Sequence, residues 1–222
     1  MSRVHVVFAV KQLTIAKTRL SGFLTHEERK RLALAMLCDT ATAARAADGV
    51  ESVTVVTADS RVATLAGSLG ASVVAEPPPI ANPDAVGQPR LNNAYRAGIT
   101  AVRAAGGTDI VLLQADLPAL RTAELTAAYA TAKPYGGSFV SDRHETGTAA
   151  LILKDGANIV PMFGPSSARR HREAGNYTLN GNWPGLRSDV DTVQDMRLAS
   201  SLGVGSATAA LLASMTWRES VA

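Results

Sequence analysis

The feature that most constrains the fold is a short apolar run at residues 110–113, Ile-Val-Leu-Leu, which contains no polar residue. A strand with one face in water alternates polar and apolar residues, so an unbroken apolar run indicates a strand covered on both faces. Similar runs occur at 4–10, 52–57 and 72–75, and helical patterns separate them. This order predicts an α/β protein whose central sheet is mostly parallel.

The remaining elements follow from local signals. Thr25 and Glu28 form a capping box before a long helix that ends near residue 47. Segment 76–90 holds five of the ten prolines, which predicts a stiff loop that folds over a ligand. The apolar, alanine-rich segment 206–215 is expected to pack either on the core or on a second subunit, and the sequence does not decide between them. Further helices are predicted at 60–69, 91–105, 122–133, from 165 onward and at 192–202, and further strands at 138–141, 149–153 and 177–179.

The totals exclude several classes of protein. The single cysteine, Cys38, rules out an internal disulfide framework and a multi-cysteine metal site. A net charge of +3 is too small to indicate nucleic-acid binding. The chain enters a strand pattern at once and has no apolar run of membrane-spanning length. With no internal repeat and no linker, residues 1–222 are predicted to form one cytoplasmic domain without a nucleic-acid or membrane partner.

An aspartate follows the central apolar run. Asp116 comes just after the predicted strand, and Leu117-Pro118 cannot continue a central strand. Open α/β sheets bind ligands at the carboxyl ends of their strands, and hard divalent cations prefer carboxylate oxygens. Asp116 is therefore a candidate metal ligand; the alternative is that it only opens the next loop.

A second acidic pair lies near the end of the chain. Alternation places Asp189 and Asp191 on the same side of an extended segment. If this segment returns to the sheet edge near Asp116, the carboxylates complete a metal site. One of these aspartates could instead serve only as a helix cap, since Thr192 or Asp191 caps the final helix.

A basic loop follows the first strand. Lys11, Lys17 and Arg19 can hold a triphosphate, with the arginine as a bidentate donor. The alternative is a solvated basic loop. The loop lacks glycine and the Gly-Lys-Ser/Thr ending, so it is not a Walker motif. Asn92 and Asn93 either cap the next helix or contact a base or ribose.

Two further segments suit an anionic ligand. Pro165 fits the first position of a helix with Gly164 as its cap, which would leave the amides of Ser166 and Ser167 free to bind a carboxylate or phosphate. In segment 146–148, hydroxyls flank a glycine, so the backbone can approach a ligand closely. A plain entry into the next strand explains this second segment equally well.

Several motifs recur together in one order, and together they resemble the phosphoenolpyruvate and 2-phospho-L-lactate guanylyltransferases of coenzyme F-420 biosynthesis. The likeness extends from residue 4 to residue 204. The motifs are Val10-Lys11, Ala16-Lys17-Thr18-Arg19-Leu20, Leu91-Asn92-Asn93-Ala94, Asp116-Leu117-Pro118, Thr146-Gly147-Thr148, Phe163-Gly164-Pro165-Ser166-Ser167 and Asp189-Val190-Asp191-Thr192.

The resemblance implies a nucleotidyltransferase fold of the glycosyltransferase-A kind, a Rossmann-like three-layer sandwich. It also implies that GMP passes from GTP to phosphoenolpyruvate, giving enolpyruvyl-diphospho-5'-guanosine and pyrophosphate. The catalytic set would be Asp116, Asp189 and Lys17. By the same resemblance, Asp116 and Asp189 match Mg²⁺ ligands, with Asp191 as a helper. Lys17 and Arg19 match the triphosphate site. The residues that match those holding the carboxylate of phosphoenolpyruvate are Thr148, Gly164 and Ser167.

Rival functions differ in acceptor or in activity. The same chemistry could act on 2-phospho-L-lactate or 3-phosphoglycerate, which share the carboxylate and the phosphate. A catalytically dead nucleotide-binding protein would be expected to lose one of the key charged residues, and this chain keeps them. A molybdopterin-type or sugar-type nucleotidyltransferase would carry a glycine-rich first loop, which is missing here. A labile enolpyruvyl product predicts a downstream transferase as a partner.

Overall fold

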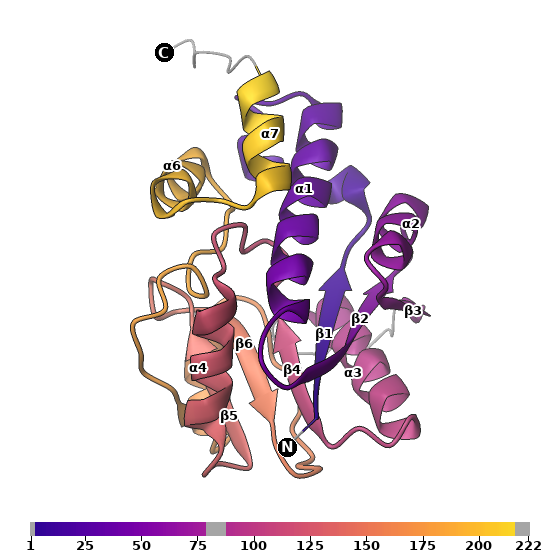
Figure 1. Cartoon of the computed structure of the whole chain (residues 1–222), viewed down its shortest axis with the longest axis vertical. Helices are drawn as coiled ribbons and strands as arrows, with labels where there is room; N and C mark the ends of the chain where they lie inside the picture. Colours follow the sequence, from indigo (N-terminus) through magenta and orange to yellow (C-terminus); the bar gives the residue numbers. More distant parts are fainter. Residues whose placement is uncertain (1–2, 79–87, 216–222) are drawn as a thin grey trace.

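A computed structural model describes residues 3–78 and 88–215 of the chain. Within these residues, seven strands form one sheet in the order β3-β2-β1-β4-β6-β5-β7 (Figure 1). The strands from β3 to β4 run parallel, whereas β6 is antiparallel to both β4 and β5. The predicted mostly parallel sheet is confirmed. The strands are β1 (Val4–Val10), β2 (Val50–Thr57), β3 (Ser72–Ala75), β4 (Asp109–Leu113), β5 (Gly137–Ser141), β6 (Thr148–Leu153) and β7 (Tyr177–Thr178).

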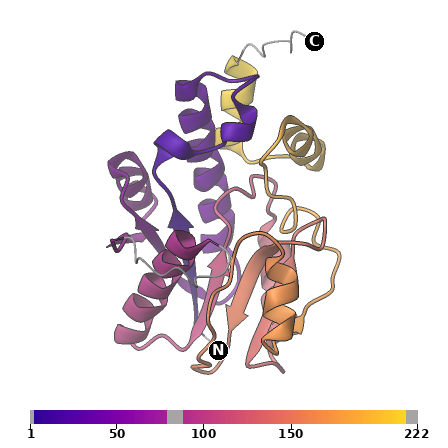
Figure 2. The same ribbon diagram turned by 180° about the vertical axis from the view of Figure 1, so that it is seen from behind.

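Helices cover both faces of the sheet. One layer contains α1, α2 and α4 (Figure 1), and the opposite layer contains α3 and α5 (Figure 2). Two short 3-10 helices lie in the loop after β1, which the sequence predicts to be irregular. The helices are α1 (His26–Arg45), α2 (Ser60–Ser68), α3 (Pro89–Ala104), α4 (Thr122–Ala132), α5 (Ser167–Glu173), α6 (Val193–Leu202), α7 (Ser206–Ser214), η1 (Leu13–Ile15) and η2 (Thr18–Leu20).

The two covered faces explain the unbroken apolar strands. In β1, Val6 and Phe8 pack toward the layer of α1, whereas Val7 and Ala9 pack toward α3. The side chains of β4 divide between the two faces in the same way. Successive strand residues point to opposite faces, so both sets must be apolar when both faces are buried.

Some helix ends differ from the predictions. The capping box is confirmed, since the Glu28 amide donates to Thr25 Oγ1 at 3.3 Å and the Thr25 amide donates to Glu28 Oε2 at 2.7 Å. Helix α3 begins at Pro89, two residues earlier than predicted. Helix α5 begins at Ser167, later than predicted. Most of the proline-rich segment, residues 79–87, lies outside the described residues, so its predicted role is not addressed.

The apolar segment near the end of the chain forms α7, which packs on α1. The Asp39 carboxylate in α1 accepts hydrogen bonds from the amides of Ala207 at 3.0 Å and Thr208 at 2.7 Å, in the first turn of α7. This side chain therefore caps a helix far from it in sequence. Of the helices in residues 3–78 and 88–215, none is long and apolar enough to span a membrane.

Candidate active site

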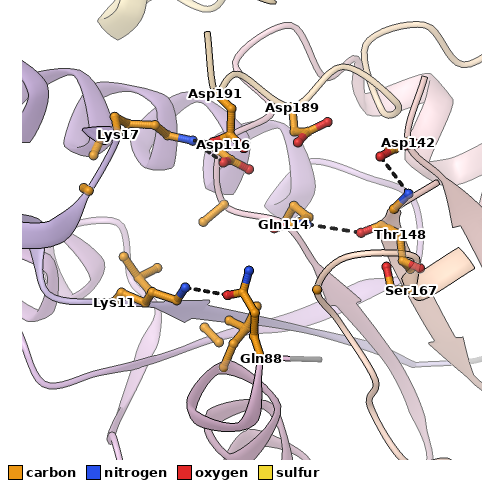
Figure 3. A pocket seen from close by; sticks show the side chains of 18 of the residues that line it. Lys11, Lys17, Gln88, Gln114, Asp116, Asp142, Thr148, Ser167, Asp189 and Asp191 are labelled. Atoms are coloured by element: carbon orange, nitrogen blue, oxygen red, sulfur yellow. Dashed lines mark hydrogen bonds and ion pairs between the residues drawn. The ribbon is translucent and has the colours of Figure 1, made fainter. Parts of the chain in front are cut away.

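The predicted site residues gather around one cavity of about 530 Å³. The cavity lies where β1 and β4 end and β6 begins, and the Gln114 amide there donates to the Ala149 carbonyl at 3.0 Å. Figure 3 shows acidic side chains at one end and Thr148 with Ser167 at another. The residues predicted for the site that line the cavity are Lys11, Lys17, Arg19, Asp116, Thr148, Gly164, Ser167, Asp189 and Asp191.

Backbone contacts bring the distant acidic segments together. The Val190 amide donates to the Asp116 carbonyl at 3.1 Å, which places Asp189 and Asp191 on either side of this contact. The next amide after Asp116, that of Leu117, donates to Thr40 Oγ1 at 3.1 Å in α1. The convergence that the sequence suggested only conditionally is thus present in the fold.

Lys17 lies among these carboxylates. Its Nζ pairs with Asp116 and, at 3.0 Å, with Asp191, and the lysine side chain is only 8% exposed (Figure 3). Burial opposes the charge, but the two carboxylates outweigh it and hold the pKa of Lys17 above its ordinary value. The residue has φ 52° and ψ 42°, a left-handed conformation that non-glycine residues rarely adopt. Such backbone outliers gather at functional sites.

The other two cations of the basic loop lie apart from Lys17. Arg19 contacts Asp191 at 3.4 Å, and its side chain is 72% exposed at the rim of the cavity. Lys11 lies on another wall, where it donates to Gln88 Oε1 (Figure 3). Burial lowers the pKa of Lys11. The loop therefore supplies cations on two sides of the cavity.

The end of the cavity that contains Asp116, Asp189 and Asp191 is called the acidic end. It carries more negative charge than the nearby cations compensate. Burial, together with the charges of Asp116 and Asp191, raises the pKa of Asp189 to about 7. Asp116 Oδ1 is buried and has no hydrogen-bond partner among the described residues. The described side chains contain no cluster of three or more His, Cys, Asp or Glu arranged to hold a metal ion. The chemistry of the carboxylates nevertheless fits a hard cation.

At the other end of the cavity, the predicted helix-start site is partly wrong. Ser166 precedes α5 in a left-handed conformation, and Gly164 is not the cap. The Ser167 amide donates to the Gly164 carbonyl at 3.1 Å, so it is not free for a ligand. Gly164 and Ser167 still line the cavity beside Thr148.

The structure does not bring Asn92 and Asn93 to the cavity. Asn92 lies inside α3, is 3% exposed, and exchanges two hydrogen bonds with the backbone of Phe163, at 3.1 and 2.7 Å. It is therefore neither a cap nor a ligand-binding residue, because both polar groups of its side chain are used. The side-chain amide of Asn93 donates to the Pro78 carbonyl at 3.4 Å.

Sequence reasoning missed several residues of the site. The Asp142 carboxylate accepts from the backbone amides of Thr146 at 3.0 Å and Gly147 at 2.8 Å, and it lines the cavity. Gln114 donates to the Thr148 carbonyl at 3.2 Å. Gln114 lies between the buried strand β4 and Asp116, and this position could have indicated from the sequence that it belongs to the site.

Comparison with known families agrees with this geometry. A family profile described as "Guanylyl transferase CofC like" matches residues 4–179. The chain belongs to this family. A phosphoenolpyruvate guanylyltransferase from Nocardia farcinica is 51% identical over 215 residues, which cover 96% of this chain and 92% of that protein. Its counterpart from Mycolicibacterium gilvum is 49% identical, over 92% of each chain.

Solved structures with the same fold come from other nucleotidyltransferases. A protein named as a nucleotide-diphospho-sugar transferase from Desulfovibrio desulfuricans G20 superposes with a TM-score of 0.71 at 16% identity, covering 96% of this chain and 95% of that one. A cytidylyltransferase from Leptospira borgpetersenii gives 0.60 at 15% identity, covering 96% and 94%. These likenesses confirm the predicted nucleotidyltransferase fold for this CofC-like chain.

Proposed function

We propose that this chain transfers GMP from GTP to phosphoenolpyruvate, forming enolpyruvyl-diphospho-5'-guanosine and pyrophosphate. The observation that carries the proposal is one cavity that joins the cluster of Asp116, Asp189 and Asp191 to Thr148 and Ser167. Its volume of about 530 Å³ lies in the usual range for small-molecule sites. Curated relatives that are 51% and 49% identical carry the name of this activity.

The reaction needs positioning and charge compensation. A phosphate oxygen of phosphoenolpyruvate attacks the α-phosphorus of GTP, the new O–P bond forms, and the bond from the α-phosphorus to the bridging oxygen breaks. Pyrophosphate leaves with that electron pair. The nucleophile is already ionised, so the protein need not accept a proton or supply a nucleophile. Both reactants are anions, so cations fixed in the cavity must reduce their repulsion.

The cations of the basic loop suit the triphosphate. Lys17 projects into the acidic end, Arg19 lies at the rim, and Lys11 lies on the other wall. These positions would place cations on two sides of a bound nucleotide. Because Lys17 is paired with Asp116 and Asp191, its role is to place one positive charge beside the reacting phosphates, and Arg19 and Lys11 bind the outer phosphates.

We assign Asp116, Asp189 and Asp191 as the residues that would hold Mg²⁺. The partnerless Oδ1 of Asp116 and the raised pKa of Asp189 both fit a missing positive charge at this end of the cavity. A bound Mg²⁺ ion would supply charge neutralisation and alignment of the phosphates. The carboxylate of the acceptor acid is assigned to Thr148, Gly164 and Ser167 at the opposite end.

The test is pyrophosphate release by purified protein with GTP, MgCl₂ and one phospho-acid at a time. Phosphoenolpyruvate, 2-phospho-L-lactate and 3-phosphoglycerate are compared at equal concentration, with mass spectrometry of each product. Pyrophosphatase, with the released pyrophosphate then measured as inorganic phosphate, or a downstream transferase that accepts the enolpyruvyl product, draws the equilibrium forward. We expect phosphoenolpyruvate to be preferred.

Two outcomes would contradict the proposal in different ways. Faster turnover of another acid would remove phosphoenolpyruvate as the acceptor and leave guanylyl transfer in place. Turnover of no acid, with product removal in the assay, would favour a non-catalytic nucleotide-binding protein.

A further inference from the structure

His171 is a buried side chain behind the acid-binding end of the cavity. It belongs to α5, has no exposed surface, and lies near the rings of Phe139 and Phe163, with centroids 5.7 and 5.5 Å away. Burial, with a smaller effect from neighbouring Arg170, lowers the pKa of His171 to about 4. The imidazole is therefore neutral near pH 7, and one ring nitrogen carries a proton while the other accepts.

Two hydrogen bonds determine which nitrogen carries the proton. The Met162 backbone amide lies 3.0 Å from His171 Nε2, and an amide N–H can only donate. Nε2 is therefore the acceptor, and the proton resides on Nδ1. Nδ1 lies 2.9 Å from Thr148 Oγ1, so it donates to that hydroxyl oxygen. The backbone at Met162 thus sets the direction of the bond to Thr148.

This direction decides what Thr148 offers to the cavity. Because its oxygen accepts from His171, its own hydrogen is left over, and no acceptor within residues 3–78 and 88–215 takes it. Thr148 lines the cavity but is only 1% exposed, so this hydrogen is available to a ligand that packs directly against the side chain. With the opposite tautomer, the hydroxyl would donate to His171 and turn only its lone pairs toward the cavity, where they would repel a carboxylate.

We propose that His171 is a positioning residue that holds the Thr148 hydroxyl as a hydrogen-bond donor to the carboxylate of the acceptor acid. The proposal rests on the proposed function, since it takes that function's assignment of Thr148 to the carboxylate. His171 does not line the cavity and acts only through Thr148. It belongs to none of the motifs that carry the family resemblance.

Two matched substitutions separate the hydrogen bonds of the imidazole. His171→Gln places an acceptor near the Nε2 position, so it keeps the bond from Met162 and loses the donor to Thr148. His171→Asn places a donor near the Nδ1 position, so it keeps the bond to Thr148 and loses the acceptor for Met162. A purely structural histidine would give both variants the same defect.

The expected result is a selective change in KM. His171→Gln raises the KM for phosphoenolpyruvate by about 10-fold to 100-fold, the value of one hydrogen bond to a charged group, and leaves the KM for GTP near that of the wild type. His171→Asn restores most of this loss. Thr148→Val reproduces the defect, and adding His171→Gln to it causes no further loss, because the two residues act as a unit. Thermal unfolding of each variant confirms that it is folded at the assay temperature.

A spectroscopic measurement reads the tautomer without substrate. In protein labelled with ¹⁵N-histidine, the His171 signals, identified by their loss in His171→Asn, should show a protonated Nδ1 and an unprotonated Nε2 at pH 7. A protonated Nε2 would overturn the proposal.

The failures are distinguishable. If wild-type protein turns over phosphoenolpyruvate but the Gln and Asn variants have equal KM values, the positioning role is wrong and the proposed function stands. If wild-type protein turns over no phospho-acid, the proposed function is wrong and the role of Thr148 falls with it, whatever the tautomer.

Discussion

Replacing Lys17 by methionine removes the positive charge that lies between Asp116 and Asp191. Methionine keeps most of the length and the apolar stem, so the main loss is the ammonium group. The three carboxylates of this end would then repel one another without compensation. We expect a less stable protein whose stability depends more strongly on divalent cations than that of the wild type.

The magnitude follows from the burial of the partners. Removing one member of a fully buried ion pair costs about 3–5 kcal/mol. The side chains of Asp116 and Asp191 are 22% and 45% exposed, so water relieves part of this cost. We therefore expect a loss of about 2–3 kcal/mol. For a chain of this length, such a loss lowers the melting temperature by about 5–10 °C.

Thermal unfolding in EDTA and in increasing MnCl₂ measures both effects. In the wild type, Mn²⁺ or Mg²⁺ would compete with Lys17 for the carboxylates, whereas in the variant the metal would replace the lost charge. The variant should therefore gain more stability from the metal than the wild type does. Lys133→Met, which removes an exposed lysine at the end of α4, is the matched control. Equal stability of Lys17→Met and wild type in EDTA, or an equal response to metal, would refute the reasoning.

Three further changes test other parts of the site. Asp116→Asn should lower kcat by at least about 100-fold in protein that is still folded at the assay temperature, whereas the exposed Asp48→Asn should not; near-normal turnover would end the metal assignment. The pKa of His171 is 6.5 in the unfolded chain and about 4 in the folded protein, so between these pH values the unfolded chain binds more protons. The stability that the neutral His171 contributes is therefore fully present above pH 6.5 and is lost as the pH falls toward 4. About 2 kcal/mol should be lost at pH 5, and urea titrations of His171→Asn should show a flatter pH dependence. Asn92→Ala should cost about 2–3 kcal/mol in urea unfolding and leave the KM for GTP unchanged, because its side chain holds Phe163 and does not reach the cavity.

The central sheet and one half of the site could be predicted because they depend on local patterns. A strand buried on both faces needs an unbroken apolar run; β1 and β3 have the predicted bounds, and β4 begins one residue before the apolar run at 110–113. Asp116 follows directly from the end of β4, where ligands bind in such sheets. The antiparallel direction of β6 relative to β4 could not be predicted, because no local sequence pattern indicates strand direction.

The partners of individual side chains could not be predicted, since they depend on contacts between distant segments. The sequence shows Lys17 as one of three loop cations for a triphosphate, but the left-handed backbone at this residue turns its side chain onto Asp116 and Asp191. Asn92 reads as a cap or a ligand contact because nothing nearby reveals its bonds to Phe163, 71 residues away. The tautomer of His171 likewise depends on the Met162 amide.

These contacts hold the carboxylates of the acidic end close together. The backbone fixes the carboxylates: the Val190 amide bonds to the Asp116 carbonyl, and the Asp195 carboxylate accepts from the Asp191 amide at 3.0 Å. Lys17 places one positive charge between two of these carboxylates through its pairs with Asp116 and Asp191. The like charges of the three aspartates are therefore held together partly by the backbone and by Asp195, which are not assigned to bind a ligand. A cation bound there, as proposed, would meet carboxylates already in position, because the fold and Lys17 hold them together before any substrate binds.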